Sequence, residues 1–131
     1  MNRDPRYVAR RARHLRFHQM VQRVSRTLPD QIQASLNNVA IVVQDEPTAE
    51  QRLDLTNGAS DILGLYQGVP MIERGGGGLM MPDRITIFAG PITRHTRSRA
   101  DMEEQIRITL LHEIGHHLGF DEYGLERIGL G

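Results

Sequence analysis

The chain has 131 residues, of which 39% are hydrophobic, and its 16 basic side chains balance 16 acidic ones. This length suits one domain with one core, and we do not expect a second folded domain. The chain has no cysteine, which excludes disulfides and thiolate metal ligands. No stretch has the length of a membrane span or the pattern of a secretory signal, so we expect a cytoplasmic protein that does not bind membranes.

Residues 1–16 are rich in arginine and poor in apolar side chains. This composition predicts a flexible or frayed helical extension, followed by a single folded domain at residues 17–131. The simplest interpretation of the extension is a solvated tail. The functional alternative is that its arginines bind nucleic acid or an acidic partner. We expect no nucleic-acid contact elsewhere in the chain, and we expect the protein to be a monomer.

Apolar residues recur at helical spacing over residues 17–36, which predicts a helix that is broken or kinked at Pro29. Two asparagines at residues 37–38 would close this helix. The β-branched run at residues 39–43 then predicts a buried strand at the centre of a small sheet.

The middle of the chain predicts loops and two further strands. Residues 45–60 are typical of a loop with one turn of helix after Thr48, whereas residues 62–66 and 84–88 favour strands. Four consecutive glycines at residues 75–78 indicate a hairpin linker between those strands, and the alternative is a mobile flap over a site.

Residues 91–99 predict a connection to a final helix, in which Arg94, His95, Arg97 and Arg99 are exposed. Asp101 and Glu104 fit a capping box at the start of that helix, and apolar residues continue at four-residue spacing to Leu118. We therefore expect a helix that begins at the surface and then enters the core.

This helix carries the pattern His-Glu-x-x-His at residues 112–116. On a helix, His112 and His116 lie on one face, so both imidazoles can bind one ion. Glu113 lies about 100° further round, close enough to act on a metal-bound water without being a ligand. The pattern therefore predicts a catalytic zinc site.

The residues after the motif support this interpretation. Gly119 is placed to end the helix in a left-handed conformation, which would bring Asp121 and Glu122 beside the metal. The alternative is a solvated helix face with ordinary polar residues, but the apolar side chains around the motif leave such a face little room.

With the motif on a helix after a short sheet, the chain resembles the zincins and, more narrowly, the small bacterial metallopeptidases called mini-zincins. The resemblance extends to residues 38–43, 63–70 and 82–88 and covers roughly residue 17 to the C-terminus. It implies an α+β minimal zincin fold, in which a small, mostly three-stranded sheet packs against helices that include the motif helix. Residues 17–131 would then be one zincin-like catalytic domain.

The resemblance also implies roles for the motif residues. His112 and His116 would bind Zn2+, and Glu113 would be the catalytic acid and base. The third ligand in the family pattern is an aspartate at the position of Glu122, which is one methylene longer. Glu122 is the expected third ligand, and Asp121, immediately before it, is the alternative.

The function that follows is a zinc-dependent metallopeptidase, which hydrolyses bonds of a peptide or protein substrate by a zinc-activated water with Glu113 as general base. The substrate would lie along an edge strand at residues 62–66 or 84–88. Three side chains are unranked candidates to assist the oxyanion: Tyr66, His95 and Tyr123.

His117 points about 100° away from His116, so we expect it to support the site or face solvent rather than bind the metal. The competing function is a non-catalytic, zinc-stabilised binding domain, with or without an arginine-rich arm for nucleic acid. In that case zinc would stabilise the fold, but Glu113 would be dispensable.

Overall fold

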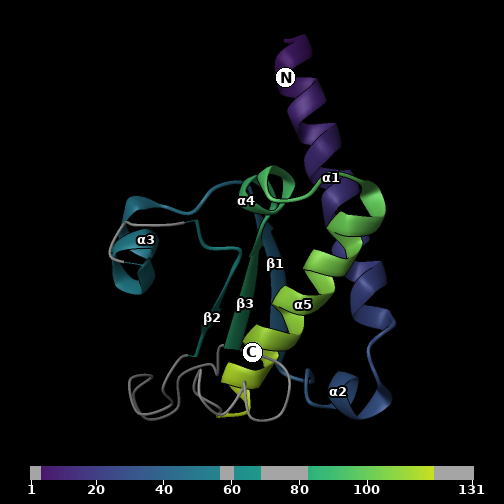
Figure 1. The fold of residues 1–131 in the computed structure, drawn as a ribbon, viewed down its shortest axis with the longest axis vertical. Coiled ribbons are helices and arrows are strands. Elements are labelled where there is room, and N and C mark those ends of the chain that lie inside the picture. The colour runs from purple at the N-terminus through teal and green to yellow at the C-terminus, as the bar shows by residue number, and fades with distance from the viewer. Residues whose placement is uncertain (1–3, 57–60, 69–82, 120–131) are drawn as a thin grey trace, which may run out of the picture.

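The computed structural model describes residues 4–56, 61–68 and 83–119. Within these ranges the fold is α+β, as the sequence predicts, and a mixed three-stranded sheet packs against helices in the manner of a minimal zincin (Figure 1). None of the described helices is long and apolar enough to cross a membrane. The elements follow one another as α1 (Pro5–Arg26), α2 (Asp30–Ala34), β1 (Val39–Gln44), α3 (Ala49–Thr56), β2 (Gly64–Gln67), β3 (Asp83–Phe88), α4 (Ala89–Arg94) and α5 (Arg99–His117).

The sheet has the order β1-β3-β2, with β1 parallel and β2 antiparallel to β3. The prediction that residues 39–43 form the centre of the sheet was therefore wrong. The centre is β3, whose last four residues are buried on both faces, whereas β1 is only half-buried along its length. A continuous β-branched run predicts a strand, but the burial of β3 depends on chain segments far away in the sequence.

The core lies between one face of the sheet and two long helices, and α5 crosses in front of the sheet in Figure 1. Alternating residues of β3, Ile85 and Ile87, point into this layer. From the helices the core receives Phe17, Met20, Val21 and Val24 of α1 and Ile106, Leu110 and Ile114 of α5.

Helix α1 is continuous from Pro5 to Arg26, and its first turns project beyond the rest of the fold (Figure 1). The side chain of Asp4 caps it by accepting from the backbone N–H of Arg6. Phe17 is the first buried residue of α1, and the start of the domain at residue 17 stays a prediction. The flexibility of residues 1–16 stays a prediction.

The predicted break at Pro29 is confirmed, because α1 ends before it and Pro29 is the N-cap of α2. Asn38 then adopts a φ of 94°, the left-handed turn that asparagine tolerates better than most residues. The single helical turn expected after Thr48 extends to the eight residues of α3. Thr48 and Gln51 cap α3 reciprocally, since each side chain accepts from the backbone N–H of the other.

Two predictions about the approach to α5 were wrong. Residues 91–99 are not a plain connection, because they include most of α4, in which Pro91 and Ile92 are buried. The predicted exposure of Arg94, His95, Arg97 and Arg99 is confirmed. Helix α5 is capped by Ser98, which accepts from the backbone N–H of Asp101, and not by a box of Asp101 and Glu104. Asp101 completes this cap by accepting from the backbone N–H of Arg97. The glycines at residues 75–78 lie outside the described residues.

Candidate metal centre

The motif occupies the last two turns of α5, where Leu110 and Ile114 bury one side of the helix in the core. The helix ends as predicted, with Gly119 at a φ of +97°. Because the buried side is anchored by packing, the remaining side holds the polar residues of the motif in fixed directions. Buried anchors of this kind give a site the rigidity that catalysis requires.

The two motif histidines face each other. The Nε2 atoms of His112 and His116 are 3.3 Å apart, and the rings meet edge to face at 81°. Two nitrogens bound at about 2.0–2.1 Å to one tetrahedral ion would be separated by about 3.3 Å, so this pair fits a shared zinc ion. The side chains of both lie at intermediate burial, open to an ion on one side.

Glu113 lies in the same cluster, with its Oε2 4.0 Å from Nε2 of His112. Ligand atoms of His112, Glu113 and His116 all lie within 4.8 Å of one another, so this group could hold a metal ion. The predicted third ligand, Glu122, and its alternative, Asp121, lie outside the described residues.

Glu113 is only 8% exposed, and its carboxylate is held by the neighbouring strand. The backbone N–H of Tyr66 donates to its Oε1 over 3.0 Å. Backbone groups along a strand point alternately toward and away from the paired strand. Leu63 points toward β3, because its C=O accepts from the N–H of Phe88, and Leu65 does the same. The N–H of Tyr66 therefore points away from β3. The outer edge of β2 thereby fixes the orientation of the motif glutamate.

Gly64 allows β2 to approach α5 this closely. A Cβ atom at Gly64 would lie 2.6 Å from Cγ2 of Thr109 and 3.3 Å from Cγ of Glu113. The first distance is too short for two non-bonded carbon atoms, so a larger residue at position 64 would push the strand and the helix apart. Glycine inside an apolar strand pattern signals such a close approach, and this signal was present in the sequence.

A second cluster, formed by Tyr66, Asp83 and His117, joins β2, β3 and the end of α5. The hydroxyl of Tyr66 donates to Oδ2 of Asp83 over 2.6 Å, and Nδ1 of His117 lies 3.0 Å from the same oxygen. Burial, together with the hydrogen bond to Asp83 and its negative charge, raises the pKa of Tyr66 to about 12. The phenol is therefore neutral and donates a hydrogen bond over the physiological pH range.

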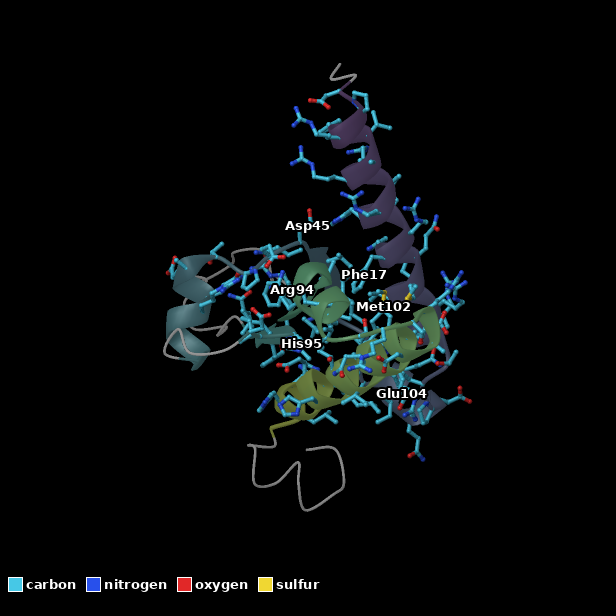
Figure 2. All side chains as sticks on the ribbon, turned by 45° about the horizontal axis from the view of Figure 1, so that its top comes forward. Phe17, Asp45, Arg94, His95, Met102 and Glu104 are labelled. Atoms are coloured by element: carbon cyan, nitrogen blue, oxygen red, sulfur yellow. The ribbon has the colours of Figure 1, made fainter. Side chains whose placement is uncertain are left out.

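Two of the three side chains expected to assist the oxyanion, Tyr66 and His95, are already hydrogen-bonded to aspartates. The hydroxyl of Tyr66 is engaged with Asp83, and His95, which is labelled in Figure 2, pairs with Asp61. Tyr123 lies outside the described residues. His117 supports the site through Asp83, which is one of the two positions that the sequence allowed. Asp83 and the backbone of Tyr66 were not recognised from the sequence, because they reach the motif only through the pairing of β2 with β3.

A cavity of about 640 Å³ lies between β2 and α5 and includes the motif. Its apolar lining includes Ile108, which is 45% exposed, and its polar lining includes the three motif residues. The described residues that line it are Ile62, Leu63, Gly64, Leu65, Tyr66, Gln105, Ile108, Thr109, His112, Glu113 and His116. A strand edge and a cluster of metal-binding side chains thus share one groove.

Comparison with known proteins agrees with this arrangement. The solved structure of a conserved hypothetical protein from Thermo thermophilus is similar, with a TM-score of 0.52 and 25% sequence identity. The similarity covers 78% of this chain and 90% of that chain. No match was found among curated proteins. Residues 36–131 match the model of a family described as zincin-like metallopeptidases, which indicates a metallopeptidase or zinc-binding function. This match includes the motif and most of the chain, and the chain belongs to the zincin-like metallopeptidase family.

Proposed function

We propose that this protein is a zinc-dependent peptidase whose centre is formed by His112, Glu113 and His116. His112 and His116 bind the ion, Glu122 is the third ligand with Asp121 as the alternative, and Glu113 is the general base. The observation that carries this proposal is the geometry of the motif: two imidazole nitrogens 3.3 Å apart and a buried carboxylate fixed beside them.

The donor set favours zinc over harder cations. Imidazole suits zinc and other transition metals, whereas Mg²⁺ and Ca²⁺ prefer sites made of oxygen. A zinc ion bound here supplies Lewis acidity toward a peptide carbonyl and toward water.

Glu113 performs the proton transfers. Its Oε1 is held by the N–H of Tyr66, so the carboxylate keeps one orientation and its Oε2 is turned toward His112. From this position it accepts the proton of the attacking water and then donates that proton to the departing amine. A fixed carboxylate avoids the entropy cost of orienting the base in each turnover.

The substrate binds as an extended peptide in the groove between β2 and α5. Of the two strands considered from the sequence, β3 is paired on both sides, whereas β2 is paired only with β3 in the described sheet. The backbone groups of Gly64 and the C=O of Tyr66 point away from β3 and offer sequence-independent hydrogen bonds. Ile62 and Ile108 favour an apolar substrate side chain.

The test is cleavage of a peptide library by zinc-loaded wild type and Glu113→Gln, with Glu104→Gln as matched control. Glu104 lies on the same helix but is exposed and pairs with Arg107. We expect Glu113→Gln to keep zinc and to lose hydrolysis by a factor of about 10²–10⁴ or more. Glu104→Gln should behave as wild type.

Turnover in Glu113→Gln equal to that of wild type would overturn the peptidase mechanism. Zinc in wild type and both variants, with zinc-dependent stability and no cleavage by any of them, would instead favour the non-catalytic, zinc-stabilised binding domain.

A further inference from the structure

A second cavity, of about 710 Å³, lies at the other end of α5, where α1 meets the end of α4 and the start of α5. Figure 2 shows Phe17 of α1 and Met102 of α5 at this junction. The lining is Arg13, Arg16, Phe17, Gln19, Met20, Arg23, Thr93, Thr96, Arg97, Ser98, Arg99 and Met102. We call it the arginine cavity, because its lining within the described part of the chain has five arginines and no carboxylate.

The positive charge of the arginine cavity is only partly balanced. Arg23 and Arg99 both approach Glu103, at 3.8 Å and 3.3 Å. The guanidinium groups of the other three arginines, Arg13, Arg16 and Arg97, form no ion pair with a carboxylate within residues 4–56, 61–68 and 83–119. Three guanidinium groups therefore face one concave surface and can form paired hydrogen bonds to an anion.

The sequence of α1 extends this charge beyond the cavity. The helix contains seven arginines and no acidic residue. Phe17, Met20 and Val24 form its buried stripe, and at the same spacing toward the N-terminus the stripe continues with Arg6, Arg10 and Arg13. A basic stripe on the projecting turns thus leads directly into the arginine cavity.

The floor of the arginine cavity is apolar. Phe17 and Met20 are 5% and 8% exposed, and Met102 packs against the same core. Methionine side chains adapt to apolar groups of varied shape. Among the described lining residues the only aromatic ring is that of Phe17, which is too buried to stack on a nucleic-acid base. Such stacking carries much of single-strand binding.

We propose that the arginine cavity binds an acidic segment of a protein partner: an extended peptide whose carboxylates meet the arginines while an apolar side chain contacts the methionine floor. This site is independent of the metal centre, because about 20 Å of helix separates Arg99 from His112. Helix α1, which supplies half of the lining, also lies outside the residues that match the family model.

The experiment measures fluorescence anisotropy of a labelled peptide of roughly eight residues, made of glutamates around two central leucines, titrated with the full-length protein. The test variant is Arg13→Gln/Arg16→Gln/Arg97→Gln. The matched control, Arg11→Gln/Arg26→Gln/Arg107→Gln, removes the same charge from residues outside both the cavity lining and the basic stripe. Circular dichroism confirms that each variant is folded.

We expect wild type to bind the peptide, the test variant to bind at least about tenfold more weakly, and the control to stay within about threefold of wild type. The same peptide with serine in place of the two leucines should bind more weakly than the original.

Three results would each overturn the proposal. The first is no binding by wild type at moderate salt, and the second is an equal loss in the test variant and the control, which would indicate diffuse charge attraction. The third is a single-stranded oligothymidine that displaces the peptide, binds more tightly and depends on the same three arginines, which would make the site one for nucleic acid.

Discussion

Two clusters of hydrogen-bonded, charged side chains connect distant segments of this chain. The first, formed by Tyr66, Asp83 and His117, lies beside the metal centre, with the Asp83 and His117 side chains 25% and 21% exposed. The second surrounds α4, where Arg94 binds both Glu46 and Asp61. Asp83 and His117 are thus sheltered, whereas Glu46, Arg94 and His95 of the second cluster are about half exposed and its Asp61 is 22% exposed.

The α4 cluster has more hydrogen bonds than the cluster at the metal centre. Arg94 donates to both oxygens of Glu46, at 2.8 Å and 3.0 Å, and again to Asp61 (Figure 2). Although burial alone would raise the pKa of Asp61, hydrogen bonds from Arg94 and His95 lower it. However, the side chains of Glu46 and Arg94 are about half exposed, so water and salt weaken these attractions.

The cluster at the metal centre has fewer bonds but fixes a more consequential residue. Tyr66 is held at its hydroxyl by Asp83, and its backbone N–H holds Glu113. The comparison teaches that the number of ion pairs does not measure importance. What matters is whether the cluster is sheltered and which side chain it positions.

The largest effect on stability is expected for Gly64→Ala, which adds a methyl group at the contact between β2 and α5. The added methyl would collide with Thr109 and crowd Glu113, so we expect a loss of about 1–3 kcal/mol in the free energy of unfolding, together with weaker catalysis. Urea unfolding and peptide cleavage measure the two effects.

Thr109→Ser is the matched rescue, because it removes the Cγ2 atom that the new methyl would meet. If Gly64→Ala is as stable as wild type, or if Thr109→Ser restores none of the lost stability, the close approach of strand and helix is not what Gly64 provides.

A smaller effect is expected for Asp83→Asn, which keeps the shape of the side chain and removes its charge. We expect the pKa of Tyr66 to fall from about 12 toward its ordinary value of 10, since the charge of Asp83 helps to raise it. The loss of a charged hydrogen-bond acceptor should cost about 1 kcal/mol of stability. NMR titration of the tyrosine ring carbon measures the pKa, and an unchanged value would remove Asp83 from this role.

The raised pKa of Tyr66 also gives a stability difference at high pH. The pKa is near 10 in the unfolded chain and about 12 in the folded one, so the unfolded chain loses its proton first. The contribution of Tyr66 to stability is complete below pH 10 and is lost as the pH rises to 12. Wild type should therefore lose stability more steeply than Tyr66→Phe between pH 10 and 12 in urea unfolding, whereas parallel curves would contradict the assignment.

The smallest effect is expected for Arg94→Gln in the exposed cluster. The urea midpoint should move less than in Asp83→Asn, and peptide cleavage should be unchanged, because water replaces the lost partners of Glu46 and Asp61. A larger destabilisation than that of Asp83→Asn would reverse the comparison between the two clusters.

Sequence patterns predicted the parts of this molecule that depend on local chemistry. The motif helix, its end at Gly119, the break at Pro29 and the three strands all follow from periodicity and from the conformations that glycine and proline allow. The close approach of His112 and His116 on one side of the helix follows from their spacing of four residues.

Sequence patterns failed where pairing between distant segments decides the outcome. The apolar run of β1 does not reveal that β3 has a partner on both sides. Helix α4 was missed because residues 91–99 were interpreted as a connection, although proline is tolerated in the first turn of a helix. Likewise, the roles of Asp83 and of the N–H of Tyr66 come from the register of β2 against β3, which single-strand patterns do not specify.

The central claim is that the end of α5 is a zinc site, and a zinc titration by calorimetry tests it most directly. The proteins are metal-free wild type, His116→Gln and His95→Gln, since His95 lies in the exposed cluster around α4. We predict one tightly bound zinc per chain in wild type and in His95→Gln, and at least about a hundredfold weaker binding in His116→Gln. Zinc binding that is absent from wild type, or unchanged in His116→Gln, would contradict the account.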